Sequence, residues 1–374
     1  MKKKLKFKIF WVGPYMPSKH FKDWIAANPA AMKWQNHLIK ALADESVEIE
    51  RLYYYPEPYW PKGKLLPSRI KISSSVVSKQ NKLDYINTIG FRNYTLFRSL
   101  KKILKKKTKN NIYKNQIIIS YNSPKWINKI FLDQDIRSKF CCVYVVADTE
   151  VLPGANGYVF LSYHSFKNQS KEINKLHLDG AIYPKINLKN NLTSCKTKNN
   201  KTIFVYSGSF HRWSGFNLLM EATKLIKDDN FELWVSGPSK YKNLMISFKK
   251  DKRIKFLGLL SETDLEHTYK SADIFINPRP VNTEGNDINF PSKLFDYLSW
   301  NKPIISTRTK SLSPEYNNIL HFVKDNPAAI ASAMKSYITN KKRYIKKFDK
   351  FKKEKNWNNE AKRLIKFLQQ LKLN

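Results

Sequence analysis

The chain has 374 residues, which is enough for two domains of about 150 residues each. Its 42% hydrophobic and 14% aromatic content permits ordinary cores and excludes global disorder. The formal net charge of +38 indicates an anionic partner, such as a nucleic acid, an anionic membrane or a phosphorylated substrate, although richness in Lys, Asn and Ile is also typical of a biased genome. The cysteines (Cys141, Cys142 and Cys195) lack disulfide or zinc spacing and fit a reducing cytoplasm.

The first residues superficially resemble a signal peptide, since four of the first six are lysines and an apolar run follows them. That run is too short, and no small-residue cleavage site follows it. We therefore predict a first strand over residues 7–12 that ends at Gly13. No apolar stretch approaches the roughly 20 residues of a membrane span.

The rest of the first half alternates between strand-like and helix-like patterns. Apolar runs predict strands, and amphipathic patterns between them predict helices. This alternation is typical of a parallel sheet with crossover helices. The predicted strands are 116–121, 141–147 and 158–162, and the predicted helices include 31–42 and 96–104.

The second half shows the same alternation after an Asn- and Lys-rich linker. We predict domains over residues 1–185 and 201–345, a linker over 186–200, and a basic C-terminal helical segment over 346–374. The predicted strands are 202–206, 231–235, 254–257, 273–277 and 304–305, and the predicted helices are 214–227, one opened by the Ser261 capping box, one starting near Pro291, and 328–338.

The segment 271–306 carries the clearest functional signal. It predicts a buried strand, a polar loop, a helix that begins at Pro291 or Ser292, and a second buried strand. Lys293 and Asp296 are three residues apart, so the first helical turn would hold a cation and a carboxylate together. Ligands of open α/β sheets bind past the carboxyl ends of strands, and helix N-termini attract phosphate. Taken alone, this pair is equally typical of a solvated helix surface.

The segment SADIFINPRP, followed by FPSKLFDYLSWNKPIIST, resembles the nucleotide-sugar site of GT-B glycosyltransferases. The resemblance is in particular to the family-4 type that builds bacterial surface polysaccharides. The resemblance covers residues 202–357 and implies an α/β, GT-B fold of two Rossmann-like domains facing each other across a cleft. It implies that Asp296 binds the ribose of the donor, and that Lys293, with Ser292 at the helix start, binds the diphosphate. Many members have a second Glu where this chain has Ile288, and Glu284 or Asp287 would replace it.

Two further loops of the second half are expected to bind the donor. Gly208 and Ser209 follow a predicted strand, and a glycine there lets the backbone approach a ligand, although most such turns are only turns. The family loop often carries an Arg and a Lys where this chain has Ser209 and Ser214, and Arg212 is our substitute for that charge. Gly258 and Leu259 resemble the segment whose backbone contacts the nucleotide base.

The acceptor is expected at the strand ends of the first half. Asp148 and Glu150 follow one predicted strand, and Asn122 follows another. Asp148 would orient the acceptor hydroxyl, and Gly13 would lie near the transferred sugar. A loop charge or a helix cap explains the two acidic residues equally simply.

We expect no metal or other cofactor. Asp133-Gln134-Asp135 imitates the Asp-x-Asp metal motif, but it precedes a predicted strand rather than ending one, so we treat it as coincidence. Without a divalent ion, the leaving diphosphate needs protein cations, for which Lys293 and Arg212 are the candidates.

Residues 96–107 form a basic amphipathic pattern in which Phe97, Leu100 and Leu104 share a face. This helix would either lie on an anionic membrane surface or turn its apolar face to the core behind a solvated lysine rim. Docking would bring the enzyme to a lipid-linked acceptor.

The sequence thus predicts a cytoplasmic, peripheral membrane glycosyltransferase that moves a sugar from a nucleotide-diphosphate donor to a glycan or lipid-linked acceptor, with retention as in the family it resembles. A nucleic-acid-binding protein is the second reading, but recognisable nucleic-acid motifs are missing from the sequence and the basic residues are dispersed. The third is a degenerate relative that binds a nucleotide sugar without transferring it.

Overall fold

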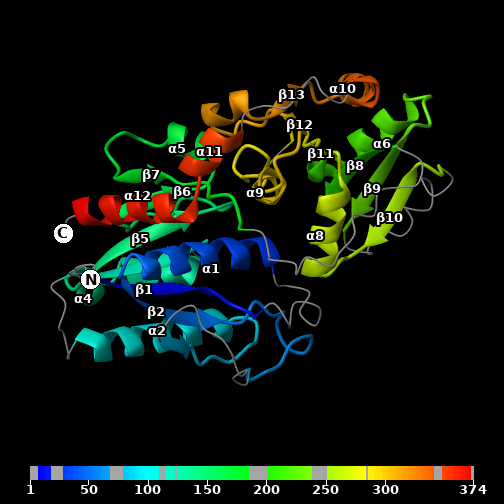
Figure 1. The fold of residues 1–374 in the computed structure, drawn as a ribbon. Coiled ribbons are helices and arrows are strands. Elements are labelled where there is room, and N and C mark those ends of the chain that lie inside the picture. Colours follow the sequence, from blue (N-terminus) through cyan, green and yellow to red (C-terminus); the bar gives the residue numbers. More distant parts are fainter. Residues whose placement is uncertain are drawn as a thin grey trace. The chain divides into compact units, whose positions relative to one another are not determined.

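The computed structural model describes residues 7–17, 28–67, 79–108, 115–122, 124–184, 201–237, 251–283, 285–340 and 348–371. The predicted linker, Cys195 and Glu284 lie outside these ranges. The chain divides into two compact units, which are Met1–Gly180 with Asn356–Asn374, and Ala181–Lys355 (Figure 1). Each unit is built on its own parallel sheet with flanking helices, which confirms the predicted fold class of two Rossmann-like α/β domains.

The first unit contains a seven-stranded sheet in the order β3-β2-β1-β4-β5-β6-β7, with every neighbouring pair parallel. The strands at its centre are the predicted ones, and β2, β3 and β7 are additional. Their bounds are β1 Phe7–Pro14, β2 Glu48–Tyr54, β3 Lys79–Lys82, β4 Asn115–Tyr121, β5 Phe140–Val146, β6 Gly157–Phe160 and β7 Lys175–His177.

Helices cover both faces of this sheet because the central strands are apolar on both sides. α2 (Phe91–Thr108) and α3 (Lys125–Phe131) pack with Phe10 and Val12 in one core cluster. α1 (Pro29–Asp44) covers the other face, where Trp11 donates its indole N–H to Gln35 at 2.9 Å. The first unit also contains two short helices, α4 Gln134–Arg137 and α5 Tyr163–Asn168.

The basic helix α2 turns its apolar face inward. Leu96, Leu100 and Leu104 are at most 1% exposed, and all three belong to the core cluster beneath the sheet. Of the two interpretations of this helix, the core-facing one is therefore confirmed, and its apolar face does not lie on a membrane. The Asp-x-Asp look-alike supports the same packing, because Asp133 and Asp135 form ion pairs with Lys101 and Lys105 of α2.

The second unit contains a six-stranded sheet in the order β10-β9-β8-β11-β12-β13, again with parallel neighbours. Each predicted strand of this half is present, and the edge strand β13 is additional. The bounds are β8 Thr202–Ser207, β9 Phe231–Ser236, β10 Ile254–Gly258, β11 Ile274–Asn277, β12 Ile304–Thr307 and β13 His321–Val323.

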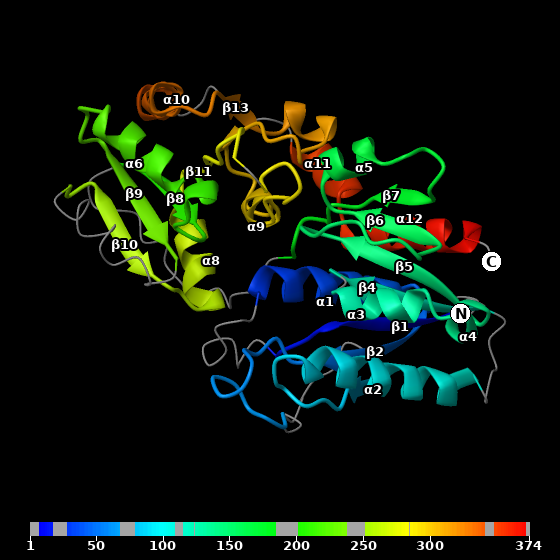
Figure 2. The same ribbon diagram turned by 180° about the vertical axis from the view of Figure 1, so that it is seen from behind.

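Two helices of the second unit begin at capping residues that the sequence predicts. α6 (Phe216–Lys224) and α10 (Pro327–Thr339) share one core cluster with the sheet (Figure 2). Asn326 caps α10, and Ser261 caps α8 (Glu262–Ser271) by accepting from the Asp264 N–H at 3.1 Å. α9 (Lys293–Leu298) starts one residue later than predicted, and Ser292 makes no capping side-chain bond. None of the helices in the described ranges is both long and apolar enough to cross a bilayer.

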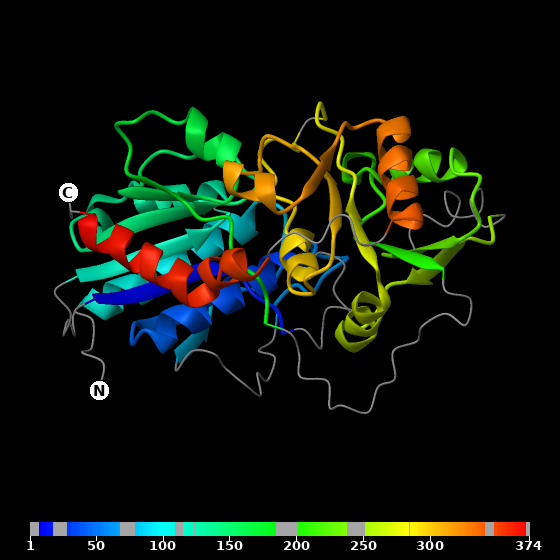
Figure 3. The same cartoon turned by 45° about the horizontal axis from the view of Figure 1, so that its top comes forward.

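The C-terminal segment forms two helices rather than one. α11 (Phe348–Glu354) belongs to the second unit, and α12 (Trp357–Gln370) belongs to the first. Asn356 breaks the segment by capping α12, accepting from the Asn359 N–H at 3.0 Å. α12 lies along α1 (Figure 3), where Trp357 contacts Trp34 edge-to-face with ring centroids 6.1 Å apart.

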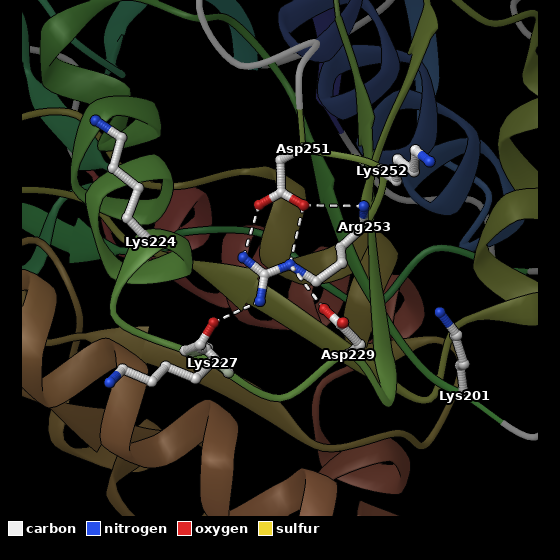
Figure 4. A pocket seen from close by; sticks show the side chains of 8 residues that line it. Lys201, Lys224, Lys227, Asp229, Asp251, Lys252 and Arg253 are labelled. Atoms are coloured by element: carbon white, nitrogen blue, oxygen red, sulfur yellow. Dashed lines mark hydrogen bonds and ion pairs between the residues drawn. The ribbon is translucent and has the colours of Figure 1, made fainter.

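An arginine holds the end of α6 against the start of β10. Arg253 makes a two-pronged ion pair with Asp251, with N···O distances of 2.9 and 2.7 Å (Figure 4). The same guanidinium donates to the backbone oxygens of Ile226 and Asp228 at the end of α6. This ion pair raises the pKa of Arg253 and lowers that of Asp251. The lysines around it form an open basic rim.

Arg253→Lys should lower the free energy of unfolding of the second unit by about 2 kcal/mol, because an ammonium cannot serve Asp251 and the helix end together. Urea unfolding measured beside Lys252→Gln, an exposed neighbour, gives the comparison. Equal stabilities of the two variants would contradict the role assigned to the guanidinium.

Candidate active site

The carboxyl edge of the second sheet has the geometry of a ligand site. β8 and β11 are neighbours, and the chain continues from them to opposite sides, with β9 and β10 on one side and β12 and β13 on the other. Loops that leave adjacent strands in opposite directions open a crevice, which is where open α/β sheets bind ligands. The loops after β8 and β11 therefore define the candidate site.

Glycines let the loops after β8, β9 and β10 approach one another. Gly208 has a φ of +138°, and its N–H donates to the Ser236 carbonyl at 3.0 Å. The Gly237 N–H donates to the Gly258 carbonyl at 2.9 Å. A Cβ on Gly237 would lie 2.1 Å from the Gly208 carbonyl oxygen, so only glycine fits there. Gly208 and Gly258, both predicted donor-binding positions, thus belong to one backbone ladder.

The loop after β8 is also fixed to the loop after β11. Gly215 has a φ of +78°, and a Cβ on it would lie 1.8 Å from the Pro278 carbonyl oxygen. Asn286, 1% exposed, donates its amide to the carbonyls of Trp213 at 3.0 Å and Pro280 at 2.7 Å. These contacts hold together the loops after β8 and β11, which form the two walls of the crevice.

Lys293 extends from α9 into this crevice. Its Nζ lies 4.2 Å from the centre of the Tyr206 ring, and a Cβ on Gly208 would be 3.2 Å from it. The ammonium is buried and has no hydrogen-bond partner among the described residues. Burial, together with the nearby charge of Arg279, lowers the pKa of Lys293 well below its usual value. A buried cation that lacks an acceptor is costly, and an anionic ligand would relieve that cost.

Arg279 is the second cation of the crevice, and sequence reasoning did not assign it a role. It follows β11 directly and donates to the Asn289 backbone oxygen at 2.9 Å, while its buried Nε has no hydrogen-bond partner in the described ranges. Burial lowers its pKa to about 10. The sequence signal that could have indicated Arg279 is a cation just after a predicted strand, in the run Pro278-Arg279-Pro280.

A network of buried hydroxyl groups connects β8 with α8 and α9. The Ser207 N–H donates to the Tyr297 hydroxyl at 2.9 Å, and the Ser207 hydroxyl contacts both Tyr297 and Tyr269. Burial raises the pKa of both tyrosines, so both hydroxyls stay protonated. Tyr297 follows Asp296 in α9, so the network fixes the helix that carries Asp296 to β8.

The other predicted donor residues lie around the same edge. Ser209 accepts a hydrogen bond from the Tyr206 hydroxyl through its carbonyl, and Ser292 precedes α9. Arg212 is exposed in a 3₁₀ turn, and Leu259 is 68% exposed beside Gly258. The structure groups Lys293 with Arg279 rather than with Arg212, whose role stays a prediction.

The position of the missing family carboxylate is occupied by Ile288, which is 38% exposed. Asp287 forms an ion pair with Lys310 at 2.8 Å, and Glu284 lies outside the described residues. The described residues hold no group of three His, Cys, Asp or Glu side chains suited to a metal.

The predicted acceptor residues gather at the carboxyl edge of the first sheet. Asn122, with a φ of +47°, accepts from the Ala147 N–H at 2.9 Å and donates its amide to Asp148. Asp148 and Glu150 are exposed, and Gly13 is the penultimate residue of β1, the strand next to β4. Asn122 and Asp148 are thus in direct contact, while their role toward an acceptor remains a prediction.

Comparisons with known structures define the class of fold. A sucrose-phosphate synthase from Thermosynechococcus elongatus superposes with a TM-score of 0.66 at 14% identity, covering 97% of this chain and 99% of that one. A glycosyltransferase from Rickettsia africae gives 0.66 at 14% identity, with 98% of each chain covered. A Listeria monocytogenes protein described as a UDP-N-acetylglucosamine 2-epimerase gives 0.56 at 12%, covering 97% and 96%. The chain has the GT-B fold.

The sequence of the second unit is similar to a known family. The family model for glycosyl transferases group 1 matches residues 201–340, the segment that contains β8, β11 and α9. The match is confined to this unit, so the sequence likeness holds for these residues. No curated protein matches the chain as a sequence relative.

Proposed function

We propose that the protein is an active, retaining glycosyltransferase that binds a nucleotide-diphosphate sugar at the crevice between the loops after β8 and β11. The observation that carries the proposal is the buried Lys293 ammonium, which lies beside Gly208 and Arg279 and has no hydrogen-bond acceptor among the described residues. A diphosphate would supply acceptor oxygens and negative charge to these two cations.

In the proposed reaction, the bond between the sugar C1 and the diphosphate oxygen breaks, and the oxygen of an acceptor hydroxyl forms a new bond to C1 while its proton passes to the leaving diphosphate. The leaving nucleoside diphosphate keeps the bonding electron pair, and Lys293 and Arg279 offset its developing charge. Asp296 binds the ribose hydroxyls. Asp148 orients the acceptor hydroxyl, and Glu150 and Asn122 line its surroundings.

The acceptor is proposed to be a glycan or a lipid-linked saccharide, and the protein to act in the cytoplasm at the membrane surface. Fold alone leaves the reaction open, because a structure described as an epimerase shares it. The family match of residues 201–340 favours transfer.

Thermal shifts against UDP-, GDP-, ADP- and CMP-sugars test the donor site, with Lys293→Ala and Asp296→Ala measured alongside. We expect a shift with one nucleotide family that both variants lose. A cooperatively melting protein that responds to none of these donors would overturn the proposal.

A degenerate, binding-only relative is distinguished by product analysis. The departures at Ile288, Ser209 and Ser214 from the family pattern motivate this alternative. Donor binding without release of nucleoside diphosphate, in the presence of membrane extracts that contain candidate acceptors, would favour it.

Donor binding should also take up a proton. Burial lowers the pKa of Lys293 in the free protein, and a bound diphosphate would raise it again. Between these two pKa values the Lys293 side chain is a neutral amine in the free protein and a charged ammonium in the complex. Donor affinity should therefore fall as pH rises through that window. Calorimetry of the responding nucleotide sugar in buffers of different ionisation enthalpy measures the uptake. Uptake of the same size in Lys293→Met would show that another group is the source.

A further inference from the structure

The first unit presents an exposed apolar patch that neither the core nor the proposed active site uses. Its members come from the loop after β2, the loop after β3 and the first turn of α2, and their exposed fractions run from 42% to 80%. We define the loop patch as Trp60, Leu65, Leu66, Ile89, Phe91 and Tyr94. Apolar side chains that stay exposed to water add nothing to the stability of the fold, so the patch points to an external partner.

The loop patch is held in place by buried polar groups. Asn87 is fully buried and donates its amide to the carbonyls of Pro58 at 2.8 Å and Lys64 at 2.9 Å. Its backbone pairs with the Trp60 N–H at 2.9 Å and the Leu65 carbonyl at 2.8 Å. These bonds join the two loops, so the apolar side chains stand on a fixed base.

Arg92 fixes the same loops to α2. Its guanidinium donates to the carbonyls of Tyr55 at 2.9 Å and Glu57 at 2.7 Å. Both loops lie at the same end of α2 (Figure 1), and they follow strands of the carboxyl edge of the sheet, the edge that also carries Asn122 and Asp148.

The charge around the loop patch identifies its partner. Residues 55–67 and 79–108 hold eleven Lys and Arg against two acidic residues, Glu57 and Asp84, and Glu57 is buried. Lys62 and Lys64 are exposed within the patch, and Lys102 and Lys106 are exposed along α2. Aromatic and aliphatic tips within a cationic rim match the interface of an anionic bilayer. A second copy of the same surface would instead bring two cationic rims together.

We propose that the loop patch inserts into the headgroup region of an anionic membrane and holds the first unit there. The docking replaces the membrane contact expected from the apolar face of α2, which is in the core. Its consequence for the acceptor, which would then be lipid-linked and within reach of Asp148, rests on the proposed function.

Vesicle flotation of the full-length protein tests the docking, using phosphatidylcholine vesicles with and without phosphatidylglycerol. Leu66→Glu/Ile89→Glu should lower partitioning to the anionic vesicles by about tenfold or more. The matched control is Leu132→Glu/Leu225→Glu, which adds the same charge at exposed leucines outside the patch and should change partitioning less than about twofold. Lys62→Gln/Lys64→Gln should weaken binding to the anionic vesicles alone.

Three results would overturn the docking. The first is that the folded protein does not bind the vesicles. The second is that both glutamate variants lose partitioning to the anionic vesicles equally. The third is that the protein forms a dimer, which only Leu66→Glu/Ile89→Glu dissociates, and does not bind vesicles. The thermal shift with nucleotide sugars, measured on the same preparations, separates the two proposals. Normal donor binding without vesicle binding refutes the docking alone, and the reverse refutes the donor site alone.

Discussion

Lys293→Met is expected to weaken nucleotide-sugar binding by about a hundredfold while leaving the free protein more stable. The ammonium is buried over the Tyr206 ring, beside Arg279, and has no hydrogen-bond acceptor in the described part of the chain. Methionine fills a similar volume without the charge. We therefore expect the melting temperature to rise by about 2–4 °C, which corresponds to about 1 kcal/mol for a unit of this size.

Differential scanning calorimetry and donor titration of the same samples measure both effects. Lys224→Met is the matched control, since Lys224 is exposed and paired with Glu221 at 2.8 Å. Its binding and stability should stay close to wild type. A destabilised Lys293→Met protein would show that the lysine is a structural group, and undiminished donor binding would remove it from the site.

Gly215→Ala is expected to cost about 4 kcal/mol of unfolding free energy and to disrupt the donor site. The φ of +78° disfavours any side chain, and the added Cβ would lie 1.8 Å from the Pro278 carbonyl oxygen. The loops after β8 and β11 must then separate, which displaces Arg279 from Lys293.

Gly285→Ala isolates the conformational part of this cost. Gly285 has a φ of +88°, but nothing lies within 4 Å of the Cβ that it would gain. It should lose only about 1 kcal/mol. Chemical unfolding of the two variants gives the difference, and equal losses would mean that the close approach of the two loops is unimportant for stability.

The sequence was informative wherever burial follows an apolar pattern. The central strands of both sheets and the capped helices α8 and α10 are confirmed to within a few residues. β2 was missed because its sequence is charged: Glu50 and Arg51 are both buried there. Glu50 pairs with Lys8 and Lys107, and Arg51 donates to Asn36, so partners distant in sequence make this burial possible.

The candidate site shows the same limit. Lys293 and Asp296 could be predicted because their spacing and the strand before them are local features. The position of Lys293 over Tyr206 and beside Gly208 could not, because it depends on β8 and β11 becoming neighbours in the sheet. The loop patch was equally hidden, since Asn87 joins its loops through contacts with residues 29 and 23 positions away in the sequence.

The placement of α12 bears on how the protein is made. Translation delivers residues 1–180 first, yet the helix that packs on Trp34 leaves the ribosome only after the whole second unit. The second unit is continuous, from Ala181 to Lys355, and can be completed while α12 is still being synthesised. The usual order, in which the N-terminal part of a chain matures first, is therefore reversed here: the second unit is finished before the unit that precedes it.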